Sequence, residues 1–67
     1  MESILVNGEP QDVPAGSTVS QLIARLDMAG KRVAVAVNRD VVPRSAYDEV
    51  RISGGDRIEI LEAVGGG

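Results

Sequence analysis

The sequence predicts an α+β fold in which one helix packs across one face of a single sheet. Three features predict it. Asn7-Gly8 is a strong β-hairpin signal, because both residues tolerate the positive φ angles of a type I′ turn. Residues 18–26 combine a helix-capping pattern with helical spacing of apolar side chains. Residues 33–37 and 57–60 have the composition or the alternation of strands.

The first two strands flank the Asn7-Gly8 turn. Residues 4–6 form a short apolar run, and a second strand is expected at about residues 10–13. The Pro-Ala-Gly sequence at 14–16 then breaks this strand.

The helix is expected to begin at Thr18. The Thr18 hydroxyl can accept a hydrogen bond from the Gln21 amide while the Gln21 side chain reaches back, which is a capping box. Apolar side chains recur with helical spacing at Val19, Leu22, Ile23 and Leu26. A helix of about ten residues that ends near Gly30 is too short to persist alone, so its apolar stripe must pack on the sheet. The expected sheet partners are Ile4, Val6, Val35, Val37, Ile58 and Ile60.

Three further strands are expected after the helix. Residues 33–37 are apolar on both faces, which favours an interior position in the sheet. Residues 38–40 form a turn and residues 41–42 return. Pro43 restricts this return strand to a short or edge position, because proline cannot donate a ladder hydrogen bond. Residues 57–60 alternate as the last strand.

The composition excludes several function classes. The 67 residues include no Cys and no His, which removes disulfides, thiolate metal sites and the side chains of Ser-His-Asp or Cys-His catalysis. A net charge of −3 and a single aromatic residue, Tyr47, argue against nucleic acid binding. No apolar run is long enough to cross a membrane, and Met1-Glu2-Ser3 lacks the positive charge of a signal peptide. We therefore expect a cytoplasmic protein with no membrane partner.

The acidic side chains offer neither a metal site nor a catalytic pair. The carboxylates of the C-terminal third are scattered over turns and one strand, at Asp48, Glu49, Asp56, Glu59 and Glu62. We expect these to be solvated surface charges, so the chain is not expected to be an enzyme in its own right.

The C-terminal glycines offer a different chemistry. Gly65, Gly66 and Gly67 lack Cβ atoms, so this segment can adopt any backbone conformation and pass through a narrow channel. Either it is an inert frayed end, or the Gly67 carboxylate is a reactive group that another protein's active site receives. The expected organisation is a folded domain over residues 1–64 and a flexible tail over residues 65–67.

In its element order, length and glycine ending, the chain resembles the ThiS family of sulfur carriers, which have the ubiquitin-like β-grasp fold. The resemblance rests on six stretches, residues 4–9, residues 18–19 with Leu22, and residues 33–38, 41–45, 55–60 and 63–67. Each stretch is unspecific alone, but their order together with the terminal glycines is specific. Tyr47 stands where the family often has Trp. The resemblance implies one mixed sheet of about five strands with one helix across one face.

The resemblance also implies how the terminus works. A ThiF-like activating enzyme would consume ATP to adenylate the Gly67 carboxylate, and a sulfur donor such as a cysteine desulfurase would convert it to a thiocarboxylate. A ThiG-like thiazole synthase would then take the sulfur into the thiazole ring of thiamin. The carrier itself would bind no cofactor and would act as a co-substrate.

Other classes stay open at this point. The MoaD family, the small subunits of molybdopterin synthase, uses the same tail chemistry, but its members are usually longer and carry an aromatic residue near the tail. A protein modifier, or a ubiquitin-like interaction domain with inert glycines, is also compatible with the sequence.

The sheet face away from the helix is expected to bind partners. Its residues alternate with the core residues of the strands, and they are small or apolar, which on a monomer is typical of a binding surface. The expected patch consists of Leu5, Ala34, Ala36, Leu61 and Val64.

Overall fold

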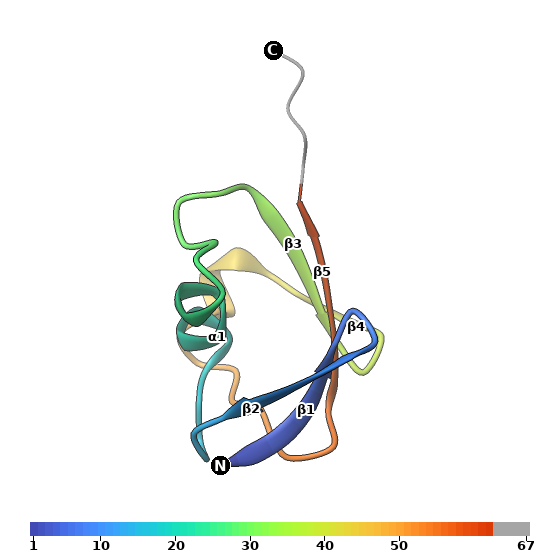
Figure 1. The fold of residues 1–67 in the computed structure, drawn as a ribbon. Coiled ribbons are helices and arrows are strands. Elements are labelled where there is room, and N and C mark those ends of the chain that lie inside the picture. Colours follow the sequence, from blue (N-terminus) through green and yellow to red (C-terminus); the bar gives the residue numbers. More distant parts are fainter. Residues whose placement is uncertain (63–67) are drawn as a thin grey trace.

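The computed structural model describes residues 1–62 and shows one mixed sheet with a helix packed on one face (Figure 1). The elements are β1 (Glu2–Val6), β2 (Glu9–Val13), α1 (Val19–Arg25), β3 (Val33–Val37), β4 (Asp40–Val42), one 3₁₀ turn (Arg44–Ala46) and β5 (Arg57–Glu62). The strand order is β2-β1-β5-β3-β4. β1 and β5 are parallel, and all other neighbours are antiparallel. The expected α+β fold, with five strands and one helix across one face, is confirmed.

Both hairpins close through two-residue turns in which both residues have positive φ. Asn7 and Gly8 have φ angles of 51° and 84°, and Asn38 and Arg39 have φ angles of 51° and 72°. This is the type I′ geometry that matches the right-handed twist of the flanking strands. The second turn is one residue shorter than expected, because Asp40 already pairs with β3.

Helix α1 begins as expected but ends earlier. The amide of Gln21 donates to Thr18 Oγ1 at 3.2 Å and the Thr18 amide donates to Gln21 Oε1 at 2.8 Å, so the capping box is present. The helix spans seven residues rather than about ten. Asp27 takes the left-handed conformation, with φ of 62°, and redirects the chain before Gly30 is reached. Asp tolerates this conformation better than most side chains, because its short polar side chain can hydrogen-bond locally.

The core contains most of the expected residues and three others. Val19, Leu22 and Ile23 of α1 are buried against the inner face of the sheet, where Ile4, Val6, Val35, Ile58 and Ile60 are also buried. Leu26 and Val37 are only half-buried at the edge of this core. The core also takes in Val13, Val42 and Ile52, which were not among the expected residues.

Ile52 shows why part of the core was missed. It lies in the long connection between β4 and β5, which has little regular structure and no apolar periodicity. The amide of Ile52 donates to the Ser17 carbonyl at 2.8 Å, and Thr18 forms an isolated bridge with Arg51. These contacts between distant segments place Ile52 in the core, where it is 2% exposed.

In the part of the chain that the structure describes, the one α-helix is too short to cross a membrane. The expected boundary between a domain at 1–64 and a tail at 65–67 lies outside the described residues and stays a prediction.

Candidate functional site at the end of strand β5

Strand β5 is the central strand of the sheet, and it ends at Glu62 at one end of the molecule (Figure 1). Four of the expected site residues, Val64, Gly65, Gly66 and Gly67, lie outside the described residues. The structure therefore defines the platform from which the chain continues toward its C-terminus.

The side chain of Asn7 extends the pairing of β5 beyond the end of β1. The Asn7 backbone amide donates to the Ile58 carbonyl at 2.8 Å, and the chain then turns away into β2. The Ile60 amide donates to Asn7 Oδ1 at 2.8 Å, and Asn7 Nδ2 donates to the Ile60 carbonyl at 3.0 Å. The side-chain amide thus takes the place of one strand residue beside β5.

Asn38, in the other hairpin turn, holds the beginning of β5. The Arg57 amide donates to Asn38 Oδ1 at 3.0 Å, and the Asn38 amide donates to the Arg57 carbonyl at 2.8 Å. Asn38 Nδ2 also donates to Asp56 Oδ1 at 3.1 Å. The two turns therefore hydrogen-bond to β5 from opposite sides, Asn38 at the beginning of the strand and Asn7 nearer its end.

The outer face of the sheet, away from α1, carries a small apolar patch next to the end of β5. Leu61 is 71% exposed and pairs with Ala34 of β3. Ala36 pairs with Glu59 of β5 on one side and with Val41 of β4 on the other. Val41 is 78% exposed. We call Ala34, Ala36, Val41 and Leu61 the outer-face patch.

Leu5, which was expected in the same patch, is on the same face but apart from it. It is half-buried and pairs with Arg57, at the opposite end of β5 from Leu61. Arg57 and Glu59 precede Leu61 on this same face of β5, so charged side chains separate Leu5 from the other apolar residues.

The sequence analysis did not include Val41 in the patch. Both Val41 and Val42 are apolar, and only the register with β3 decides which of the two faces outward.

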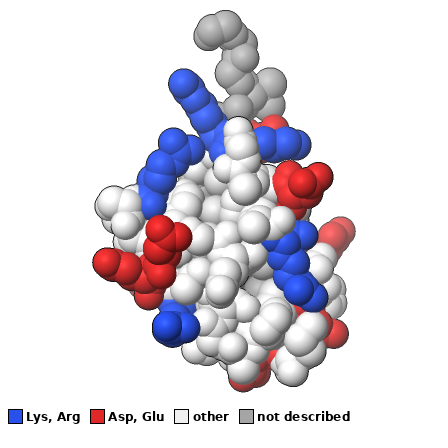
Figure 2. Space-filling model, turned by 90° about the vertical axis from the view of Figure 1, so that its left-hand side faces the viewer, with Lys and Arg blue, Asp and Glu red and all other residues white. Residues whose placement is uncertain are grey.

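Basic side chains surround the end of β5. Lys31 and Arg32 precede β3, whose first residue, Val33, pairs with Glu62. Lys31 Nζ lies 3.8 Å from Glu62 Oε1. Arg44 begins the 3₁₀ turn. Figure 2 shows Lys and Arg side chains gathered at this end of the molecule, with acidic side chains mostly below them.

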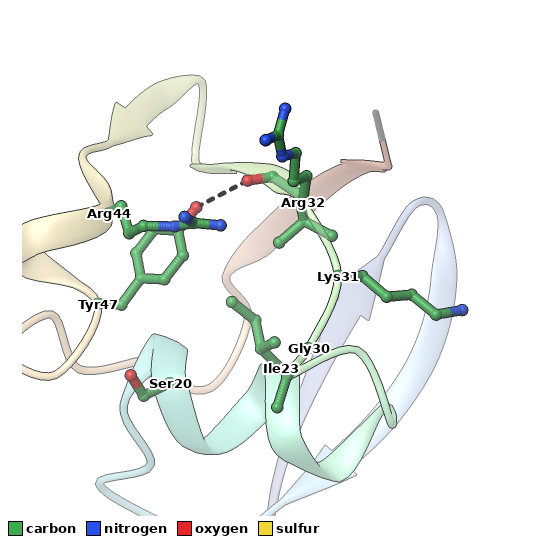
Figure 3. Close-up of a pocket in the computed structure, with 9 residues that line it drawn as sticks. Ser20, Ile23, Gly30, Lys31, Arg32, Arg44 and Tyr47 are labelled. Atoms are coloured by element: carbon green, nitrogen blue, oxygen red, sulfur yellow. Dashed lines mark hydrogen bonds between the residues drawn. The ribbon is translucent and has the colours of Figure 1, made fainter. Parts of the chain in front are cut away.

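A groove of about 500 Å³ opens between α1, the start of β3 and the 3₁₀ turn (Figure 3). Its rim includes Arg32 and Arg44, and the Tyr47 hydroxyl donates to the Val33 carbonyl at 3.1 Å across it. Because α1 ends at Arg25, Lys31 and Arg32 lie away from the helix and beside the end of β5.

The carboxylates of the described residues do not gather into a metal site. Among residues 1–62, no group of three or more Asp or Glu side chains is placed to hold a metal ion. Glu59 faces the outer side of the sheet and Glu62 the inner side, so the two carboxylates do not converge.

A mixed five-stranded sheet with one helix across it, and a central strand that leads to the C-terminus, defines the class of ubiquitin-like β-grasp domains. The model of the ThiS family matches residues 4–67, which includes the three terminal glycines. The chain belongs to the ThiS family.

Known proteins agree with this assignment. The chain is 33% identical over 64 residues to the sulfur carrier protein ThiS of Escherichia coli, an alignment that covers 96% of this chain and 97% of the relative. The crystal structure of the thiamine biosynthesis protein ThiS from Geobacter metallireducens superposes with a TM-score of 0.83 at 34% identity, covering 97% of this chain and 99% of that one. The predicted membership of the ThiS family is confirmed.

A second group of relatives is much longer. The chain is 38% identical over 64 residues to the thiazole synthase of Paramagnetospirillum magneticum and 41% identical to that of Magnetococcus marinus. In each case the alignment covers 96% of this chain but only 20% of the relative. The chain therefore spans about a fifth of the length of these relatives.

Proposed function

We propose that the carboxylate of Gly67 carries sulfur, as a thiocarboxylate, to the enzyme that forms the thiazole ring of thiamin. The observation that carries this proposal is that the ThiS family match runs to residue 67. The strand that leads toward this terminus is the central one, and side-chain amides hold it on both sides. A rigid domain that aims a terminus free of side chains fits a carrier whose cargo is bound at its last atom.

The chemistry needs activation of the carboxylate by a partner. A carboxylate is a poor electrophile until one of its oxygens becomes part of a good leaving group, and adenylation by ATP achieves this. The outer sulfur of a persulfide donor, such as that of a cysteine desulfurase, then attacks the acyl adenylate and displaces AMP, which leaves the carrier joined to the donor as an acyl persulfide. A thiol of a partner protein attacks the donor's inner sulfur, forms a disulfide with it and releases the thiocarboxylate of Gly67. The resulting thiocarboxylate sulfur is an anionic nucleophile, as a thiolate is.

The partners we propose are a ThiF-like activating enzyme, the sulfur donor and a ThiG-like thiazole synthase. The two relatives named thiazole synthase support the last of these, since a segment similar to this chain occurs within them. The chain would act as a co-substrate in the cytoplasm rather than as an enzyme. It would bind no cofactor of its own, because the activating enzyme consumes the ATP.

We further propose that the outer-face patch contacts these partners. Leu61 and Val41 are exposed apolar side chains beside the small residues Ala34 and Ala36, which let another surface approach closely. Exposed apolar surface of this kind is typical of interaction sites. Its position next to the end of β5 lets one partner cover the patch and receive the terminus together.

The test is intact-mass spectrometry after incubation with activating enzyme, ATP and a sulfur donor. The expected product is heavier by the exchange of one oxygen for sulfur, and it should then support thiazole formation by the synthase. The same protein extended by a C-terminal tag, which removes the free Gly67 carboxylate, is the control and should stay unmodified. A parent protein that is never thiolated, with an activating enzyme shown to thiolate its own carrier, would overturn the proposal.

A further inference from the structure

The sign of the charge around the end of β5 is opposite to that of the whole chain. The chain has 7 basic and 10 acidic residues, a net charge of −3. Nevertheless, three basic residues, Lys31, Arg32 and Arg44, lie around the place where β5 ends. Figure 2 shows this gathering of Lys and Arg side chains at one end of the molecule.

Two of these side chains are available to an outside group. Lys31 is paired with Glu62, and in Figure 3 it points away from Arg44. Among residues 1–62, no carboxylate forms an ion pair with Arg32 or Arg44, and both residues are exposed. Within residues 1–62, no ion pair accounts for the position of these two guanidinium groups at the rim of the groove beside α1.

The two arginines also connect the surfaces of the site. Both line the groove beside α1, and both line a more open depression of about 370 Å³ that Ala34 and Leu61 of the outer-face patch also line. A partner that covers the outer-face patch and takes up the terminus must therefore pass over Arg32 and Arg44. Guanidinium groups in such a position suit bidentate pairing with carboxylates.

We propose that Arg32 and Arg44 form an electrostatic docking site for an acidic protein surface, the carboxylate-lined rim around the channel in which the activating enzyme receives the C-terminus. This inference rests on the proposed function. Complementary charge at the rim of an interface accelerates encounter and fixes orientation, and adds less to the strength of the final complex. The net negative charge of the chain would otherwise repel an acidic partner, so a local positive end also orients the molecule with its terminus forward.

The experiment compares two double variants of the full chain. Arg32→Glu/Arg44→Glu reverses the proposed docking site. Arg25→Glu/Arg39→Glu makes the same change in net charge on the last turn of α1 and at the opposite end of β3. Initial rates of thiocarboxylate formation are measured against carrier concentration, at ionic strengths of about 0.1 M and about 1 M, where the screening length falls from about 10 Å to about 3 Å.

At the lower ionic strength we expect the Arg32/Arg44 variant to raise the KM for the carrier by about 10- to 100-fold, with kcat little changed. At high salt this difference should largely disappear, because screening removes both the attraction in the parent and the repulsion in the variant. The control variant should stay within about twofold of the parent, since its charges lie away from the site. Arg32→Lys/Arg44→Lys should retain most of the salt-dependent effect.

The outcomes separate this inference from the proposed function. If the parent is thiolated and the Arg32/Arg44 variant has the parent's KM and salt dependence, the docking site is wrong while the carrier function stands. A rise in the KM for ATP with an unchanged KM for the carrier would assign the arginines to the nucleotide and would also overturn it. If charge reversal unfolds the protein, Arg32→Gln/Arg44→Gln gives the same comparison without added negative charge, and an unchanged KM there contradicts the proposal.

Discussion

Asn7 and Ile60 lie 53 residues apart in the chain, and the side chain of one exchanges two hydrogen bonds with the backbone of the other. Asn7 can do this because it directly follows Val6, the last residue of β1 that pairs with β5. The I′ turn holds it there at a φ of 51°. The same residue therefore closes a local hairpin and secures the central strand near its C-terminal end.

Replacement of Asn7 should measure the strength of this connection. Asn7→Gly keeps the positive φ but removes both side-chain hydrogen bonds, and we expect a loss of about 1–3 kcal/mol in the free energy of unfolding. Asn7→Ala should lose about 1 kcal/mol more, because a Cβ atom disfavours the left-handed conformation. Denaturant unfolding monitored by circular dichroism is the measurement. Two variants as stable as the parent would show that the Asn7–Ile60 contact contributes nothing.

Two leucines of the helix stripe should differ in their contribution to stability. Leu22 is 1% exposed and its truncation to Ala should cost about 2–5 kcal/mol, a large share of the roughly 3–10 kcal/mol expected for a domain of this size. Leu26 is only half-buried, and Leu26→Ala should cost less, about 1–2 kcal/mol. The helical spacing alone placed both leucines in the same apolar stripe. Equal melting temperatures for the two variants would contradict the difference in burial.

The outer-face patch can be tested without disturbing the core. Leu61→Arg introduces a charge at a position that is 71% exposed, so the free energy of unfolding should change by less than about 0.5 kcal/mol. Binding to the activating enzyme, measured by titration calorimetry, should weaken, because the partner would have to cover the new charge. Ala24→Arg, at an exposed position on α1, adds the same charge on another surface and should bind like the parent. Unchanged binding of Leu61→Arg would remove the patch from the interface.

Features set by neighbouring residues could be predicted from the sequence. The Asn7-Gly8 turn, the capping box of Thr18 and Gln21, and the alternation of β5 all depend on local rules of backbone geometry. The early end of α1 could not be predicted, because Asp27 and Gly30 both suit a left-handed residue and local rules favour the glycine.

Features set by contacts between distant segments were not accessible in the same way. Ile52 joins the core only because its segment bonds to Ser17, and Val41 faces outward only because of its register with β3. Arg32 and Arg44 are 12 positions apart in the sequence, and only the fold brings both to the same groove. No run of basic residues in the sequence therefore marked this surface. Sequence patterns therefore predicted the sheet and the helix, and the structure added the surface around the end of β5.

The most direct test of the carrier account compares the parent with a variant that lacks Gly67. The deletion leaves an end about 3.3–3.6 Å short of its place in the activating enzyme, and reaction at a bound carboxylate tolerates far less displacement. Removing a terminal residue should leave stability almost unchanged. Both proteins are incubated with activating enzyme, ATP and a sulfur donor, and their intact masses are followed over time. The account predicts that the parent gains the thiocarboxylate mass and the deletion variant does not; thiolation of the variant at the parent's rate would contradict it.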